Sequence, residues 1–151
     1  SGTMGNGIAQ TFALFNFNVR LYDINSENLK KGEQTILKNL QRMVNKEKIT
    51  ESEAENTVGN IKYTSDFDSI LNADLVIEVV SENFKLKKSI FKELDLKCPK
   101  NTIIASNTSS ISITKLAEAT TRKDKVIGMH FMNPVPIMKL VEVINSKYTC
   151  R

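Results

Sequence analysis

The chain has 151 residues, of which 40% are hydrophobic and 25% charged, and its formal net charge is +4 at pH 7. This length allows one α/β domain with a substantial core, and the lack of any apolar run near the roughly 18 residues of a bilayer span predicts no membrane association. The charge is too mild to predict a nucleic-acid-binding protein, although it suits one that handles phosphorylated ligands. Cys98 and Cys150 show neither metal-ligand spacing nor a disulfide framework, so we expect no metal ion and a cytoplasmic location.

Residues 1–7 match the end of a glycine-rich dinucleotide-binding loop, G-x-G-x-x-G. Gly2 and Gly5 take the places of its second and third glycines, so we expect the first glycine and the preceding strand to lie outside the chain. Gly2 would let a pyrophosphate approach the backbone, and Gly5 would let the following helix pack closely on the sheet. A glycine cluster alone is more often a turn, but the helix, strand and terminal carboxylate that follow favour a nucleotide site.

Hydrophobic spacing predicts the next three elements: a helix over residues 8–15 that stops near Asn16, a strand over 18–23, and a helix from Ser26, its expected N-cap, to Asn45. The side chains expected to face the core are Ile8, Phe12 and Phe15 in the first helix and Leu29, Ile36, Leu37, Leu40, Met43 and Val44 in the second. The opposite face of the second helix carries a basic stripe, Lys31, Lys38, Arg42 and Lys46. Such a stripe is usually solvated, but it could attract the phosphates of an anionic ligand.

The predicted strand over residues 18–23 ends at Asp23, which lies 21 positions after Gly2. An acid near this spacing accepts hydrogen bonds from the ribose hydroxyls of NAD and repels the additional phosphate of NADP. The sequence therefore predicts NAD as the coenzyme.

Further along the chain, short apolar runs alternate with helical segments. The expected strands cover residues 61–64, 74–80, 102–105, 126–131 and 139–144, and the expected helices begin at Thr50 and cover 66–71, 86–97 and 113–119. This alternation predicts right-handed crossovers and an α/β fold, a doubly wound and mostly parallel sheet of the Rossmann type. Ligands bind such sheets outside the carboxyl ends of the strands, so polar residues there are the candidates for a site.

Polar residues follow four of the predicted strands: Asp23, Ser81 with Glu82, the run over residues 106–110, and His130 with Asn133. The run over 106–110 could be an ordinary turn that caps a helix. His130 is the only histidine in the chain. A lone histidine in an apolar strand is often a hydrogen-bonded core residue, but its unperturbed pKa of about 6.5 makes it the obvious general base if the strand end meets the coenzyme.

Four motifs, in order, resemble the NAD-binding domain of the L-3-hydroxyacyl-CoA dehydrogenase family, most closely its bacterial 3-hydroxybutyryl-CoA dehydrogenases. They are Gly2-Thr3-Met4-Gly5-x-Gly7-Ile8, Ser106-Asn107-Thr108-Ser109-Ser110, Gly128-Met129-His130-Phe131-x-Asn133-Pro134 and Met138-Lys139-Leu140-Val141-Glu142-Val143. The resemblance implies that residues 1–151 are an NAD-binding domain without the helical C-terminal domain that, in the family, closes the substrate cleft and forms a homodimer. We therefore expect the chain to be inactive by itself.

The family uses NAD to oxidise the 3-hydroxyl of an L-3-hydroxyacyl-CoA to the ketone, so the resemblance implies this reaction, with 3-hydroxybutyryl-CoA as substrate, in fatty acid or butanoate metabolism. It implies that His130 is the general base, that Glu142 orients its ring, that Ser109 hydrogen-bonds the substrate oxygen and that Asn133 fixes substrate or histidine. The NAD-binding residues that it implies are Gly2, Thr3, Met4, Gly5, Asp23, Glu82, Lys87 and Asn107.

Several of these residues have plainer interpretations. Glu142 could be a surface acid on an edge strand, and Glu82 a helix-entry acid that interacts with the helix dipole. Lys87 could belong to a solvated face with Lys85 and Lys88. The chain could also be another NAD-dependent hydroxy-acid dehydrogenase on the same fold, or a nucleotide-binding module without catalysis.

Overall fold

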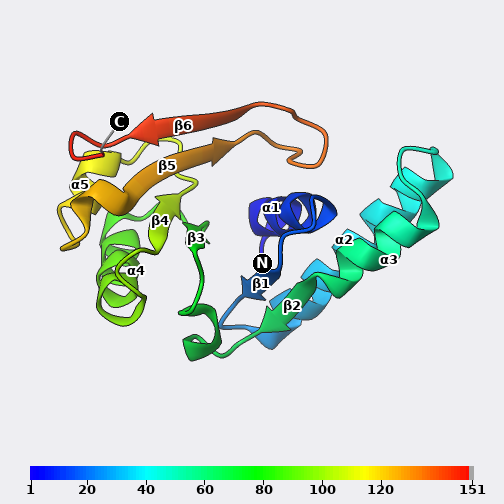
Figure 1. Ribbon diagram of the computed structural model, residues 1–151, viewed down its shortest axis with the longest axis horizontal. Helices are drawn as coiled ribbons and strands as arrows, with labels where there is room; N and C mark the ends of the chain where they lie inside the picture. Colours follow the sequence, from blue (N-terminus) through cyan, green and yellow to red (C-terminus); the bar gives the residue numbers. More distant parts are fainter. Residues whose placement is uncertain (150–151) are drawn as a thin grey trace. The chain divides into compact units, whose positions relative to one another are not determined.

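The computed structural model describes residues 1–149 and divides into two compact units. The first unit comprises residues 1–70 and 133–139, and the second comprises residues 71–132 and 140 onward. Among the described residues there are five α-helices and six strands, labelled in Figure 1. Cys150 lies outside the described residues.

The first unit packs three helices against a two-stranded parallel sheet. Its elements are α1 (Thr3–Leu14), β1 (Val19–Tyr22), α2 (Ser26–Asn45), α3 (Glu51–Gly59), β2 (Ile61–Thr64) and the short 3₁₀ helix η1 (Asp68–Ile70). β1 pairs with β2 in a register that joins Val19 to Ile61 and Tyr22 to Thr64. The core of this unit consists of Ala9, Ala13, Leu21, Leu29, Ile36, Leu40 and Ile61.

Three details of this unit differ from the sequence prediction. Phe15 does not pack in the core but is 71% exposed, because α1 ends at Leu14 and the left-handed Asn16, with φ of 65°, turns the chain away. Leu37 is 46% exposed, since it lies beside the buried stripe of α2 and not within it. The N-cap of α2 is Asn25 instead of Ser26, and its side-chain oxygen accepts a hydrogen bond from Glu27 N–H at 2.8 Å.

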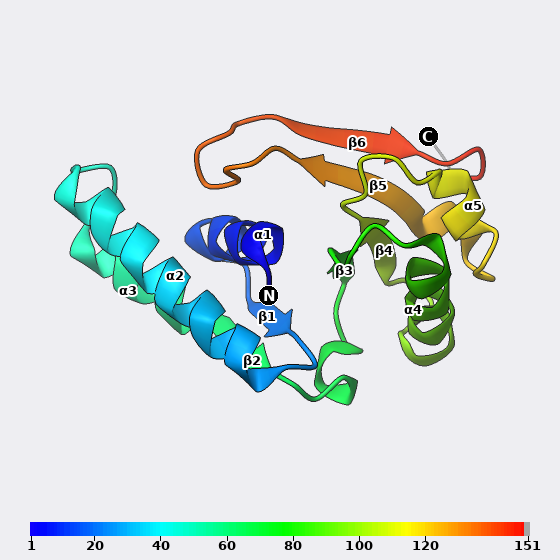
Figure 2. The same cartoon turned by 180° about the vertical axis from the view of Figure 1, so that it is seen from behind.

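The second unit is built on a four-stranded sheet in the order β3-β4-β5-β6 (Figure 1). Its elements are β3 (Leu75–Glu78), α4 (Phe84–Lys97), β4 (Ile103–Ser106), α5 (Ile113–Ala117), the 3₁₀ helix η2 (Lys123–Lys125), β5 (Val126–Phe131) and β6 (Val141–Asn145). β3, β4 and β5 are parallel to one another, whereas β6 runs antiparallel to β5, as Figure 2 shows from behind. Every residue of β6 is exposed.

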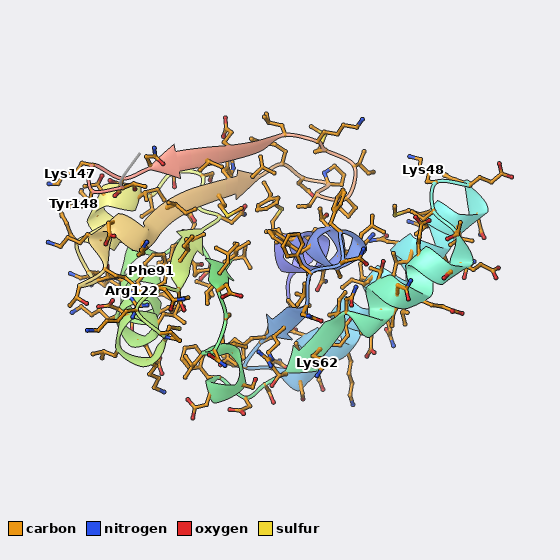
Figure 3. All side chains as sticks on the ribbon, in the orientation of Figure 1. Lys48, Lys62, Phe91, Arg122, Lys147 and Tyr148 are labelled. Atoms are coloured by element: carbon orange, nitrogen blue, oxygen red, sulfur yellow. The ribbon has the colours of Figure 1, made fainter. Side chains whose placement is uncertain are left out.

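The side chains of α4 and α5 supply much of the core of this unit. Phe91 and Leu116 are fully buried. Arg122 binds the end of α4: its Nε lies 2.8 Å from Oδ1 of Asp95, and its guanidinium donates a hydrogen bond to the Cys98 carbonyl at 2.9 Å. Phe91 and Arg122 are labelled in Figure 3. Cys98 is itself buried, and this burial raises the pKa of its thiol despite the nearby Arg122.

The strand predicted over residues 74–80 is less buried than its apolar run indicates. Leu75, Val76 and Ile77 are half-buried, and Glu78 is the buried residue of the strand. Among the described residues β3 pairs only with β4, so it is an edge strand of its sheet. The architecture is thus mixed α/β with mostly parallel pairing, in two sheets. Within residues 1–149, no helix is long and apolar enough to cross a bilayer, and no cluster of ligands is suited to a metal ion.

Candidate functional site

The antiparallel pairing of β5 with β6 brings a histidine and a carboxylate together. The register places His130 directly opposite Glu142, and Nδ1 of the ring lies 2.8 Å from Oε2 of the carboxylate. An ionised carboxylate only accepts hydrogen bonds, so this contact assigns the proton to Nδ1 and leaves Nε2 as a hydrogen-bond acceptor. The side chains are 24% and 52% exposed, respectively, so the ring can be reached from solvent. Glu142 is therefore a surface acid, as the plainer interpretation has it, and also a partner of His130.

His130 and Glu142 line a cavity of about 330 Å³. The segment from Thr108 to Thr114, which includes the exposed Ser109, lines the same cavity. The structure thus brings together three of the four predicted catalytic residues, a potential base, its carboxylate partner and a hydroxyl donor. All three belong to the second unit.

Glu82 fixes the loop that carries Ser109. Its Oε1 accepts hydrogen bonds from Thr108 Oγ1, from the Ser110 amide at 3.2 Å and from Ser110 Oγ at 2.8 Å. Partial burial opposes ionisation of Glu82, but these bonds and the ammonium of Lys87 outweigh it and lower the pKa to about 2. Asn83 is the N-cap of α4, so Glu82 also lies at the entry of this helix, as the plainer interpretation has it.

Lys87 is not on a solvated face, because its side chain is only 1% exposed. The Nζ atom lies 2.8 and 3.0 Å from the two carboxylate oxygens of Glu78, 3.2 Å from the Val80 carbonyl and 3.5 Å from Glu82 Oε2. Glu78 in turn accepts hydrogen bonds from the Val80 amide at 2.6 Å and from Ser106 Oγ at 2.8 Å. A buried network therefore joins β3, α4 and the end of β4.

Sequence reasoning missed Glu78. The available signal was a carboxylate inside the apolar run over residues 74–80, because a buried charge in a strand needs a partner. The partner, Lys87, lies nine positions further along the chain.

Asn107 lies between the ends of three strands. Its backbone N–H donates to the Glu78 carbonyl at 2.9 Å, and its side-chain Oδ1 accepts from the Phe131 amide at 2.8 Å. Of the predicted coenzyme residues, Glu82, Lys87 and Asn107 therefore gather at the carboxyl ends of β3 and β4, in the unit that also holds His130.

The remaining predicted coenzyme residues belong to the first unit. α1 begins at Thr3, with Gly2 as its extended N-cap, and no heavy atom beyond the chain neighbours lies within 4 Å of the place that a Cβ on Gly2 would occupy. A pyrophosphate could therefore approach the N-terminus of α1 at this point. Met4 is half-buried, and Gly5 is buried.

Asp23 follows β1 and is held as a carboxylate. Its Oδ2 accepts from the hydroxyl of Ser1 at 2.9 Å, and its Oδ1 accepts from the Asn25 amide at 2.9 Å. Burial acts against ionisation, but the hydrogen bonds from the Asn25 amide and the Ser1 hydroxyl lower the pKa of the carboxyl. The hydroxyl of Ser1 already makes the type of bond that a ribose hydroxyl would make, so Gly2 and Asp23 together fit NAD.

Asn133 is not among the residues that line the His130 cavity. It is exposed and lines a second cavity of about 150 Å³ together with residues of α1 and α2, among them Thr3, Asn6 and Asn39. The basic stripe of α2 is exposed along its length, as a solvated face would be.

Comparisons with known proteins identify the family of this chain. Residues 1–151 match the family described as "3-hydroxyacyl-CoA dehydrogenase, NAD binding domain". The chain is 48% identical to a "Probable 3-hydroxybutyryl-CoA dehydrogenase" of Bacillus subtilis over 149 residues, covering 99% of this chain and 52% of that protein. It is 44% identical to the 3-hydroxybutyryl-CoA dehydrogenase of Clostridioides difficile, covering 100% of this chain and 54% of that protein.

The crystal structure of (S)-3-hydroxybutyryl-CoA dehydrogenase from Ralstonia eutropha superposes with a TM-score of 0.95 at 49% identity, covering 98% of this chain and 52% of that one. The chain thus spans about half the length of the curated relatives it matches. It belongs to the 3-hydroxyacyl-CoA dehydrogenase family, of which it contains the NAD-binding domain.

Proposed function

We propose that this domain serves an enzyme that oxidises an L-3-hydroxyacyl-CoA, with 3-hydroxybutyryl-CoA as the expected substrate, to the 3-oxoacyl-CoA. The observation that carries the proposal is the cavity that is lined by His130, paired with Glu142 at 2.8 Å, and by Ser109. Together, these three side chains provide a base (His130), a group that stabilises the protonated base (Glu142) and a hydrogen-bond donor for the reacting oxygen (Ser109).

NAD, when bound, would supply the hydride acceptor for the carbon that bears the hydroxyl. The hydroxyl proton passes to Nε2 of His130, whose Nδ1–H donates to Glu142, so the carboxylate stabilises the imidazolium that forms. Ser109 Oγ donates a hydrogen bond to the substrate oxygen. A base placed in this way contributes about 10²- to 10⁴-fold, or roughly 3 to 5 kcal/mol of barrier.

We propose that Gly2, Thr3, Met4 and Gly5 hold the pyrophosphate of NAD through the backbone at the start of α1, and that Asp23 binds its ribose. Glu82 and Asn107 would contact the coenzyme at the strand ends. Lys87 would contribute by holding Glu82, because its ammonium is buried and bound to Glu78. This assignment is supported by the open space at Gly2, by the ionised carboxylate of Asp23, and by the position of Glu82, Lys87 and Asn107 at the carboxyl ends of β3 and β4.

Two further proposals concern the whole domain. The parallel pairing within each sheet supports a doubly wound Rossmann-type fold, and an experimental structure of the full-length protein tests it. The basic stripe of α2 and the acyl-CoA substrate suit each other in charge, so Lys38→Glu should raise the KM for the thioester and leave that for NAD unchanged.

The full-length protein, NAD and either L-3-hydroxybutyryl-CoA or free 3-hydroxybutyrate provide the test. We expect NADH formation with the thioester, and a loss of about 10²-fold or more in kcat for His130→Ala with little change in the Kd for NAD. Turnover of the free acid alone would favour another hydroxy-acid dehydrogenase. NAD binding without turnover of any hydroxy compound would indicate a nucleotide-binding module.

A further inference from the structure

The end of β5 that carries His130 extends beyond the strand beside it. The parallel ladder between β4 and β5 joins Ile104 to Val126 and ends with Ser106 opposite Gly128. β5 continues to Phe131, so its last three residues pass the point at which β4 ends. On its other edge, the antiparallel ladder with β6 continues to Phe131 and Val141.

The side chain of Asn107 takes over where the backbone ladder stops. Asn107 is the first residue after β4, and its Oδ1 accepts the Phe131 amide hydrogen at 2.8 Å. Because a backbone amide can only donate, this contact also fixes which end of the side-chain amide faces β5. The side-chain carbonyl thus acts as a substitute for the next backbone acceptor of β4.

Asn107 is itself fixed from the opposite side. Its backbone N–H donates to the Glu78 carbonyl at 2.9 Å, and Glu78 is held by the buried bond to Lys87. A continuous set of hydrogen bonds therefore runs from the buried ion pair, through Asn107, to the residue that follows His130.

We propose that Asn107 is a positioning residue for His130. With β6 on one edge of β5 and Asn107 on the other, the backbone at 130–131 is held on both sides, and this holds the His130 ring in line with Glu142 and the cavity. The role rests on the function proposed above, and it differs from contact with the coenzyme because it uses the Oδ1 end of the amide, whereas a coenzyme contact would use the Nδ2 end.

Two substitutions separate these ends in the full-length protein. Asn107→Ala removes both the acceptor and the donor, whereas Asn107→Asp keeps an acceptor of the same shape and removes the donor. For Asn107→Ala we expect the Phe131 amide to exchange about tenfold faster with solvent deuterium, since its acceptor is lost. We also expect the downfield proton signal of the His130 Nδ1–H bond to Glu142, assigned by its loss in His130→Gln, to broaden, and kcat to fall about tenfold.

Asn107→Asp should restore the Phe131 protection and the His130 signal, while any rise in the KM for NAD persists. Asn83→Ala is the matched control, because Asn83 Oδ1 also accepts a backbone amide, that of Leu86, at 3.1 Å in the same unit. This control should accelerate exchange at Leu86 and leave Phe131 and the His130 signal unchanged.

The proposal is overturned if Asn107→Ala leaves the Phe131 exchange rate and the His130 signal as in the parent, or if it changes only the KM for NAD. If Asn107→Ala does not fold, Asn107→Asp still decides, because loss of Phe131 protection in that variant contradicts the role. A parent protein without dehydrogenase activity would refute the proposed function. The exchange and spectroscopic measurements would still show whether Asn107 positions His130.

Discussion

The buried pair of Lys87 and Glu78 predicts a large and strongly non-additive effect on stability. Their side chains are 1% and 2% exposed, and Lys87 Nζ makes contacts of 2.8 and 3.0 Å to Glu78 and 3.2 Å to the Val80 carbonyl. Lys87→Met removes all of these contacts and leaves the Glu78 carboxylate buried, with the Val80 amide and Ser106 Oγ as its remaining donors among residues 1–149.

An uncompensated buried charge of this kind costs about 3 to 5 kcal/mol, so Lys87→Met should lower the free energy of unfolding by that amount. Glu78→Gln should cost less, because the lysine keeps Glu82 as a partner at 3.5 Å. The double variant Glu78→Gln/Lys87→Met buries no charge and should be more stable than Lys87→Met alone. Urea unfolding followed by circular dichroism measures all three values.

The same helix supplies the control. Lys97 pairs with Glu93 at 3.1 Å, but these side chains are 43% and 46% exposed, so Lys97→Met should cost at most about 0.5 kcal/mol. If Lys87→Met costs no more than Lys97→Met, or if the losses of the two single variants simply add in the double variant, the burial argument is wrong.

Three further predictions concern the proposed site. His130→Ala and Glu142→Gln should each slow turnover strongly, and the double variant should be no slower than roughly the poorer single one, as for residues that act as a unit. The control is Glu118→Gln, which affects an exposed pair with Lys147 at 3.1 Å. Losses in turnover that multiply in the double variant would indicate separate roles for His130 and Glu142. The parent should prefer NAD over NADP in kcat/KM because Asp23 repels the extra phosphate of NADP, and Asp23→Ala should reduce this preference. Equal kcat/KM of the parent with both coenzymes would contradict the assignment of Asp23 to the ribose of NAD. The pKa of Glu82 is lowered from 4.5 to about 2, so the stabilising effect of its carboxylate is complete above pH 4.5 and is lost as the pH falls toward 2. The melting temperature of the parent should therefore decrease more steeply between pH 4.5 and 2 than that of Glu82→Gln. Parallel curves would show that the contacts of Glu82 to Thr108 and Ser110 contribute nothing to stability.

The sequence predicts the elements of this fold well because their signals are local. Apolar spacing places α2 at Ser26–Asn45, and the helix expected from Thr50 is α3, whose N-cap is Thr50. Local spacing is less informative about packing. Leu37 and Phe15 have the spacing of core residues, yet both are exposed because the buried stripe is narrower and α1 ends earlier than the pattern indicates.

The candidate site was predictable where two residues are joined by one hairpin. His130 and Glu142 occupy neighbouring strands, so the motifs and the turn between them predict the pairing that the register shows. The hydrogen bonds of Glu78 and Asn107 were not predictable in the same way, because they depend on which strands are neighbours in the sheet. Lys87 is one of several lysines near the start of α4, and only the packing distinguishes the buried one from Lys85 and Lys88, which are exposed.

The antiparallel register of β5 and β6 also determines which changes in chain length the proposed chemistry can tolerate. Residues inserted between Phe131 and Val141 would leave His130 opposite Glu142 as long as the ladder re-forms in the same register. Deletion of a single residue within β6 would send Glu142 to the opposite face of the sheet, because side chains alternate along a strand. Length variation in this protein lineage should therefore collect in the connecting segment, while β6, although exposed at every residue, keeps its length.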